Sequence, residues 1–129
     1  MKDLHYVYRD PVFQVDVHLR TGSRKKIEKF CNNLNINDYN AAGCWTMEIV
    51  KKNGRQSAYL IWLNDKTNYY HLAHEALHLV KMIFKDRGIE FTSDNDEMIA
   101  YYQEYWLRRF WGSISRSRKR KVKHAKKSK

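Results

Sequence analysis

Leu72-Ala73-His74-Glu75-Ala76-Leu77-His78-Leu79-Val80-Lys81-Met82-Ile83-Phe84 is the stretch of sequence around which the fold is organised. The run contains no Gly or Pro, and its residues are mostly good helix formers, so it predicts an α-helix. Apart from the His and Glu residues, only Lys81 interrupts its apolar character. A helix that is apolar on nearly every side is typical of a buried position, and we therefore expect it to lie in the core.

Residues 74–78 of this run read H-E-x-x-H. His74 and His78 are four residues apart, so on a helix their rings lie on one face, within reach of a single metal ion. Glu75 is turned by about 100° from His74, which suits a base acting on a metal-bound water better than a ligand. Burying these groups is costly unless a metal compensates them. The alternative is two core histidines bound by backbone carbonyls or carboxylates, with Glu75 paired to a Lys or Arg.

A catalytic zinc ion usually has three protein ligands and one open position, so a third ligand is needed. Our candidate is Glu97, which follows a helix stop at Gly88 and a polar turn over residues 92–96. There it would begin a second helix packed beside the first. Asp94 and Asp96 are alternative ligands. All three acids could instead simply complement the positive end of that helix dipole.

H-E-A-L-H at 74–78, followed by Glu97-Met98-Ile99-Ala100-Tyr101, resembles the gluzincin arrangement of zinc metallopeptidases. Residues 63–106 are similar to small zincin-like peptidases encoded by bacteriophages. The resemblance implies Zn²⁺ held by His74, His78 and Glu97, with Glu75 as general base. Larger gluzincin families often carry an Asp four residues after the ligand Glu, where this chain has Tyr101. Support of a ligand His is therefore unassigned.

The leading functional hypothesis is hydrolysis of a peptide or protein substrate by zinc-activated water. Stabilising the oxyanion needs a further donor, for which His71, Tyr70 and Tyr101 are candidates. His71 lies one turn before His74 and could equally be a surface residue or a partner of a ligand.

The surrounding sequence predicts an α+β fold in which a small antiparallel sheet packs against three helices. An N-terminal strand over residues 13–20 alternates apolar and polar side chains, and an amphipathic helix follows Gly22 and Ser23. Residues 44–50 and 57–63 form a hairpin across Asn53-Gly54. Beyond the helix of residues 72–84, residues 95–111 form the last helix, with an apolar stripe that is typical of core.

Charge divides the chain into a single domain over residues 1–114 and a tail over residues 115–129. Of the net charge of +11, the tail contributes nine Lys or Arg residues and no acid, which leaves 16 basic against 14 acidic side chains in the domain. The tail cannot bury enough apolar surface to order itself, so we expect a flexible basic arm. Such an arm favours nonspecific contact with nucleic acid. An acidic protein, an anionic membrane surface or a purely solubilising role are alternatives.

Cys31 and Cys44 have no C-x-x-C spacing, and the N-terminus lacks a signal-peptide pattern. No apolar stretch is long enough to cross a bilayer. We expect reduced thiols in a cytoplasmic protein, in the host cytoplasm if the chain is phage-encoded. Two rivals to the peptidase remain: a nucleic-acid-binding accessory protein that uses residues 115–129, and a catalytically inactive zincin scaffold.

Overall fold

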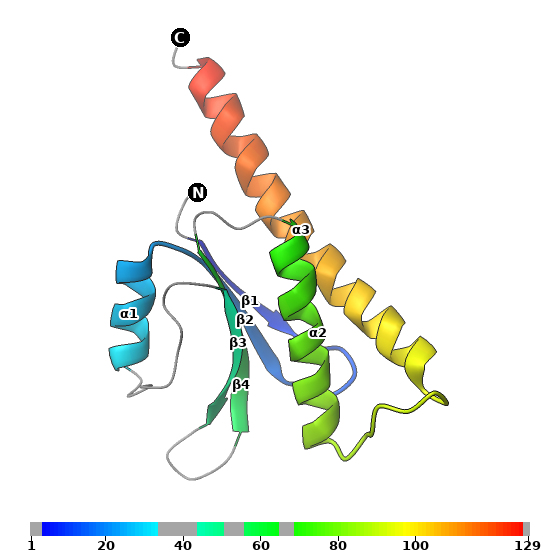
Figure 1. Ribbon diagram of the computed structural model, residues 1–129. Coiled ribbons are helices and arrows are strands. Elements are labelled where there is room, and N and C mark those ends of the chain that lie inside the picture. Colours follow the sequence, from blue (N-terminus) through cyan, green and yellow to red (C-terminus); the bar gives the residue numbers. More distant parts are fainter. Residues whose placement is uncertain (1–3, 34–43, 51–55, 65–68, 128–129) are drawn as a thin grey trace.

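The computed structural model describes residues 4–33, 44–50, 56–64 and 69–127. In chain order, the elements are β1 (Leu4–Arg9), β2 (Asp16–Gly22), α1 (Arg24–Asn33), β3 (Trp45–Val50), β4 (Gln56–Asn64), α2 (Tyr69–Asp86) and α3 (Asp96–Lys127). Figure 1 shows α1 on one side of the sheet and α2 with α3 on the other. The α+β prediction is therefore confirmed. The predicted Asn53-Gly54 turn lies outside the described residues.

The sheet is mixed, which corrects the expectation of an antiparallel sheet. Its order is β1-β2-β4-β3, with β2 and β4 parallel and the two outer pairs antiparallel. The physical reason is the connection through α1. The chain leaves β2, crosses the sheet, and returns in the β3–β4 hairpin, which places β4 beside β2 in the same direction.

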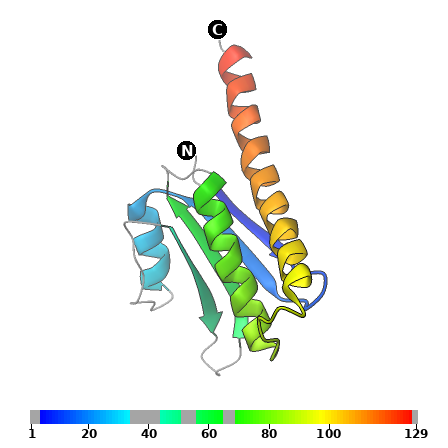
Figure 2. The same cartoon turned by 45° about the vertical axis from the view of Figure 1, so that its right-hand side comes forward.

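Alternation along β4 builds two cores on opposite faces of the sheet. Tyr59, Ile61 and Leu63 belong to the cluster shared with α2 and α3, whereas Trp62 belongs to the cluster shared with α1. The view in Figure 2 shows α2 lying along one face. From α1, Ile27 and Cys31 are buried against the opposite face, as the amphipathic pattern predicted.

The N-terminal region differs from the prediction in two ways. Strand β1 was not predicted from the sequence, and the predicted strand over residues 13–20 begins only at Asp16, because residues 10–15 form a turn. Asp10, which is fully buried, organises that turn: its carboxylate accepts hydrogen bonds from the backbone N–H of Val12 (3.1 Å) and Phe13 (2.5 Å).

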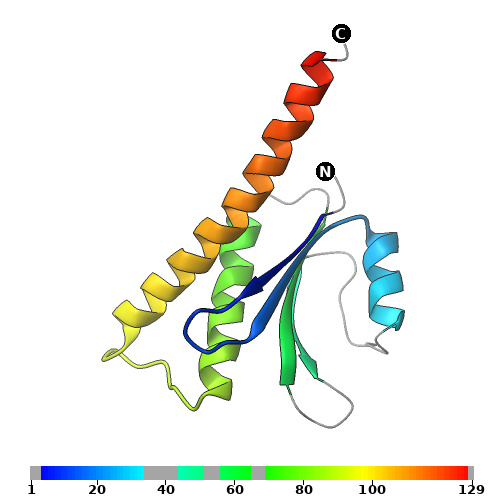
Figure 3. The same ribbon diagram turned by 180° about the vertical axis from the view of Figure 1, so that it is seen from behind.

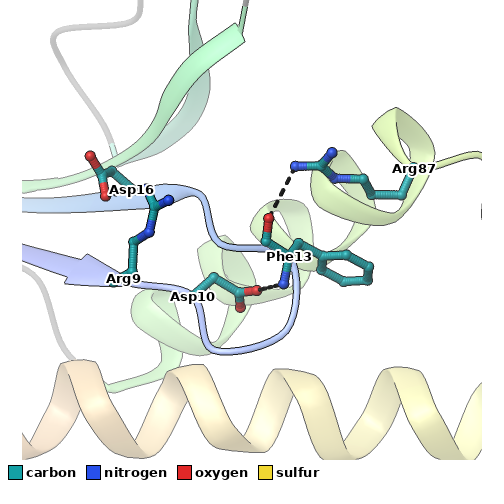
Figure 4. A network of polar contacts seen from close by, with 5 residues as sticks. All are labelled: Arg9, Asp10, Phe13, Asp16 and Arg87. Atoms are coloured by element: carbon teal, nitrogen blue, oxygen red, sulfur yellow. Dashed lines mark hydrogen bonds and ion pairs between the residues drawn. The ribbon is translucent and has the colours of Figure 1, made fainter.

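This turn also ties the sheet to both long helices. Arg87, just after the end of α2, donates to the Phe13 carbonyl at 3.3 Å (Figure 4). The Tyr102 hydroxyl of α3 donates to the Asp10 carboxylate. Burial, and then the hydrogen bond to Asp10, raises the pKa of Tyr102, so this hydroxyl keeps its proton and acts as a donor.

The predicted stop of α2 at Gly88 is confirmed. Gly88 has φ of 71°, a left-handed conformation that glycine adopts without a steric penalty. The N–H of Gly88 bonds to the Lys85 carbonyl and the N–H of Ile89 to the Phe84 carbonyl, so carbonyls of the last turn are satisfied.

Helix α3 is longer than predicted. It continues to Lys127 instead of ending near residue 111, and it runs beyond the edge of the sheet (Figure 3). Residues 115–127 are thus helical, which differs from the expected flexible arm. No Gly or Pro follows Gly112, and Arg and Lys are good helix formers, so nothing local stops the helix.

Within the described ranges, no helix is both long enough and apolar enough to cross a membrane. Cys31 is buried, Cys44 is partly buried, and neither forms a disulfide within the part of the chain that the structure describes.

Candidate functional site

The two histidines of the H-E-x-x-H motif lie together on α2, as helical spacing predicted. Their Nε2 atoms are 3.1 Å apart, and their rings meet edge to face with centroids 4.8 Å apart. Both side chains are exposed. The expectation that this helix is buried nearly all round is therefore wrong, because its motif face is open to solvent. The cost of burying the imidazoles, which had favoured a metal, does not arise.

Glu75 is the buried member of the motif, with 5% of its surface exposed. Its carboxylate accepts a hydrogen bond of 3.0 Å from the Thr46 hydroxyl on β3, and the same hydroxyl also contacts the Glu75 carbonyl at 3.0 Å. A buried carboxylate of this kind is stabilised by a direct donor. Glu75 thus joins α2 to the outer strand β3, while the two rings face solvent.

The third predicted ligand does not join the pair. Glu97 is exposed in the first turn of α3, beside Asp96. Figures 1 and 3 show that this end of α3 stands apart from α2, and that the two helices approach each other further along. There Gln103 of α3 donates to the Ala73 carbonyl at 3.3 Å. Glu97 and Asp96 are placed where they complement the helix dipole.

The other candidates are exposed as well. Tyr70 and Tyr101 are 80% and 67% exposed, and His71 and Asp94 are exposed as well. Among the residues that the structure describes, no group of three His, Cys, Asp or Glu side chains could hold a metal ion. The predicted zinc site of His74, His78 and Glu97 is therefore not formed, because only its two histidines meet.

A cavity of about 550 Å³ begins beside this pair, along the second half of α2. It is lined by His78, Lys81, Met82 and Lys85 of α2 and by Gly88, Ile89, Glu90 and Phe91. The Lys81 ammonium lies 5.6 Å from the centre of the Phe91 ring. The lining thus combines apolar surface with two ammonium groups, the His78 ring and the Glu90 carboxylate.

A second histidine pair went unnoticed in the sequence. His5 on β1 and His18 on β2 stack with ring centroids 5.1 Å apart, and Nε2 of His5 lies 2.9 Å from Nδ1 of His18. Burial lowers the pKa of His5, and the charge of Arg20 lowers it further. Burial likewise lowers the pKa of His18, although Asp16 opposes the shift. Thirteen residues separate the pair, so only the pairing of β1 with β2 brings them together.

Comparisons with known proteins give little further help. No family model matches the chain. No curated protein matches it either. Among solved structures, the chain is similar to the conserved protein GrpB from Enterococcus faecalis, with 12% identity and a TM-score of 0.40 over 86% of this chain and 82% of that one.

These findings correct the resemblance to gluzincin peptidases. The resemblance requires three ligands for one Zn²⁺, and no group of three metal-ligating side chains is formed within the described ranges. The family inference rested on spacing within one helix and on one downstream acid. Helical spacing does bring the two histidines together, but it could not place Glu97, whose position depends on how α3 leaves the preceding loop.

Proposed function

We propose that the protein binds nucleic acid, without sequence preference, through residues 115–127 of α3, which we call the basic segment. Eight of its thirteen residues are Lys or Arg and none is acidic. Its lack of aromatic residues favours contact with phosphates over stacking on bases. The observation that carries the proposal is that this segment continues a helix whose earlier turns are fixed in the core.

The density of positive charge suits a phosphate backbone. From residue 116 to residue 127 a helix rises about 17 Å, so its eight charges follow one another at about 2 Å. Duplex DNA carries one negative charge per about 1.7 Å of its axis. Charges at this spacing displace condensed counterions efficiently, and binding should therefore weaken steeply as salt increases.

The anchoring of α3 supports the same function. Trp106, Phe110 and Ile114 are buried in the main core, and each follows the previous one by about one helical turn along α3. The buried turns thus fix the direction in which α3, and with it the basic segment, leaves the domain (Figure 1). A helix that is ordered before binding loses less conformational entropy than a flexible arm, which favours affinity.

The experiment compares two variants that each lose three positive charges. The basic-segment variant changes Lys119, Arg120 and Lys121 to Gln. The control changes three exposed residues of α1 and α2 to Gln, namely Lys25, Lys29 and Lys85. Fluorescence anisotropy with a labelled 20-base-pair duplex at two salt concentrations measures both affinity and salt dependence.

The basic-segment variant should bind about tenfold more weakly, and its slope of log K against log salt should flatten by roughly two to three units. The control should stay within about threefold of wild type, because its charges lie outside the segment. Equal losses in both variants, or binding to anionic vesicles but not to the duplex, would overturn the proposal.

Peptide hydrolysis with Glu75 as general base stays a prediction of the sequence, since nothing in the fold or the comparisons tests it. It has lost the support of the family resemblance. The test of this hypothesis measures the zinc content per chain and the turnover of a peptide library, in the wild type and in His78→Ala. Stoichiometric zinc that disappears in the variant would restore the hypothesis.

A further inference from the structure

Two exposed tyrosines, which we call the tyrosine pair, stand at the start of α2. Tyr69 and Tyr70 are 42% and 80% exposed, and Tyr70 is the most exposed of the large apolar side chains that the structure describes. A single exposed ring is common on protein surfaces and needs no explanation. Neighbouring rings that are held in place at the surface instead indicate contact with a ligand or partner.

The rings of the tyrosine pair are positioned from the core outward. Trp111 of α3 packs against the main core and meets the Tyr69 ring edge to face, with the ring centroids 5.2 Å apart. The Tyr69 ring in turn meets the Tyr70 ring edge to face, with centroids 6.4 Å apart. Contacts of this kind favour one relative orientation of the rings. The pair is therefore held through Trp111 by the same helix that carries the basic segment.

The contact with Trp111 also places the tyrosine pair next to the basic segment. Figures 1 and 2 show the first turn of α2 beside α3, shortly before α3 extends beyond the sheet. Trp111 lies about one turn before the segment begins, and position 118 lies about two full turns after Trp111, so both positions are on the same side of α3. The pair and the segment therefore follow one another along one side of that helix.

This combination of groups matches a nucleic acid whose bases are unpaired. Lys and Arg residues attract the phosphates, and exposed aromatic rings offer flat surfaces on which unpaired bases stack. In a duplex the bases are already paired and stacked on one another, so they are not free to cover a tyrosine ring. Every base has a flat π face, so stacking on tyrosine agrees with binding that has no sequence preference.

We infer that the tyrosine pair stacks on bases of a single-stranded nucleic acid whose phosphates contact the basic segment. Tyr70 supplies the more accessible ring, and Tyr69 supports it and supplies part of a second ring surface. This inference rests on the proposed function and adds to it the class of nucleic acid. Charge on the basic segment acts on single strands and duplexes alike, whereas the tyrosine pair acts only on strands with unpaired bases.

The test uses the full chain and measures binding by fluorescence anisotropy at one fixed salt concentration. Three labelled probes are compared: an oligothymidine strand, a strand of the same length whose sugars carry no bases, and the duplex used for the basic-segment variant. The strand without bases keeps the phosphates and removes every partner for stacking. Comparing the two strands therefore separates stacking from attraction between charges.

The variants remove or keep the ring of Tyr70. Tyr70→Ala deletes the ring, whereas Tyr70→Phe keeps a ring of the same shape and loses only the hydroxyl. Tyr69→Ala is a second variant of the pair. The matched control is Tyr101→Ala, because Tyr101 is 67% exposed and lies near the start of α3, at the opposite end of that helix from the basic segment. Thermal unfolding of each variant checks that the fold is retained.

Tyr70→Ala should weaken binding of oligothymidine about tenfold, as expected for the loss of one stacked base, and should leave the strand without bases and the duplex within about twofold. Tyr70→Phe and Tyr101→Ala should stay within about twofold of wild type for all three probes. The inference is wrong if Tyr70→Ala weakens the strands with and without bases equally, or if its effect on oligothymidine is no larger than that of Tyr101→Ala.

The basic-segment variant distinguishes this inference from the proposed function. It should weaken binding of all three probes, because all three carry phosphates. If it does so while Tyr70→Ala and Tyr69→Ala change none of them, the proposed function stands and stacking by the tyrosine pair is excluded. If the wild-type protein binds none of the probes, the proposed function itself fails, and the inference that rests on it fails as well.

Discussion

The two faces of the sheet are built differently. The face under α2 and α3 carries a continuous apolar core in which Tyr8, Trp106 and Phe110 contact one another at ring distances of 5.2 to 6.0 Å. The face under α1 carries a small cluster around Trp62, and beside it lie a cavity and the His5 and His18 pair. We call the face under α2 and α3 the thick face and the face under α1 the thin face. Because the core of the thick face stabilises the fold, the thin face can accommodate charged groups and a cavity.

The largest expected effect is on the thick face. Trp106→Ala should lower the free energy of unfolding by about 3–5 kcal/mol, because it deletes a fully buried ring that packs against both Tyr8 and Phe110. Denaturant unfolding followed by circular dichroism measures it. A loss below about 1 kcal/mol would show that this face does not dominate stability.

The second-largest expected effect concerns the turn of residues 10–15, which connects the sheet to α2 and α3 on the thick face. Asp10→Ala should cost about 2–3 kcal/mol, since it removes the acceptor of the Val12 and Phe13 N–H groups and leaves the Tyr102 hydroxyl without it. The control is Asp16→Ala, which breaks an exposed ion pair with Arg9 and should cost less than about 0.5 kcal/mol. Similar losses in the two variants would contradict the role given to Asp10.

On the thin face, Ile27→Ala should cost about 2 kcal/mol, near the lower end for a buried aliphatic side chain, because few buried residues surround it. The same denaturant experiment applies. The comparison of the two faces fails if this loss equals or exceeds that of Trp106→Ala.

The smallest effect is a pH dependence that belongs to the thin face. His5 and His18 have pKa values lowered in the folded state, so the unfolded chain binds more protons near the ordinary histidine pKa of about 6.5. Their contribution to stability is present above that pH and is lost as the pH falls through it. Asp16 and Arg20 of β2 face the pair, and Lys26 of α1 lines the same cavity as His5.

Unfolding measured at pH 8 and pH 6 tests this, because carboxylates stay ionised over that range. His5→Gln should reduce the loss of stability between the two values, and the exposed His71→Gln should leave it unchanged. If the pH dependence of stability in His5→Gln equals that of the wild type, the His5 and His18 pair does not cause it.

Local spacing predicted what depends on one element. The helix of residues 72–84, its end at Gly88 and the convergence of His74 with His78 all follow from helical geometry, and the structure has them. Tyr6 and Tyr8, which alternate along β1 and pack toward the main core, are the feature of the sequence that indicates this strand.

The predictions that were wrong concern how helices and strands are arranged relative to one another. The exposure of Glu97 follows from the direction in which α3 leaves its loop, and the parallel pairing of β2 with β4 follows from the crossing through α1. Neither leaves a periodic mark in the sequence. The pairing of His5 with His18 and both cavities likewise exist only once strands and helices have been assembled.

The contact between the ends of the folded part also bears on how the chain is made. The Tyr8 hydroxyl donates to Ser113 at 2.6 Å across 105 residues of sequence. During synthesis, the first strand therefore leaves the ribosome long before the helix that covers it exists. The aromatic side of β1 must wait, exposed or held by a chaperone, until residues 106–113 have been translated, so slow elongation over the intervening segment would prolong the period in which nascent chains can aggregate.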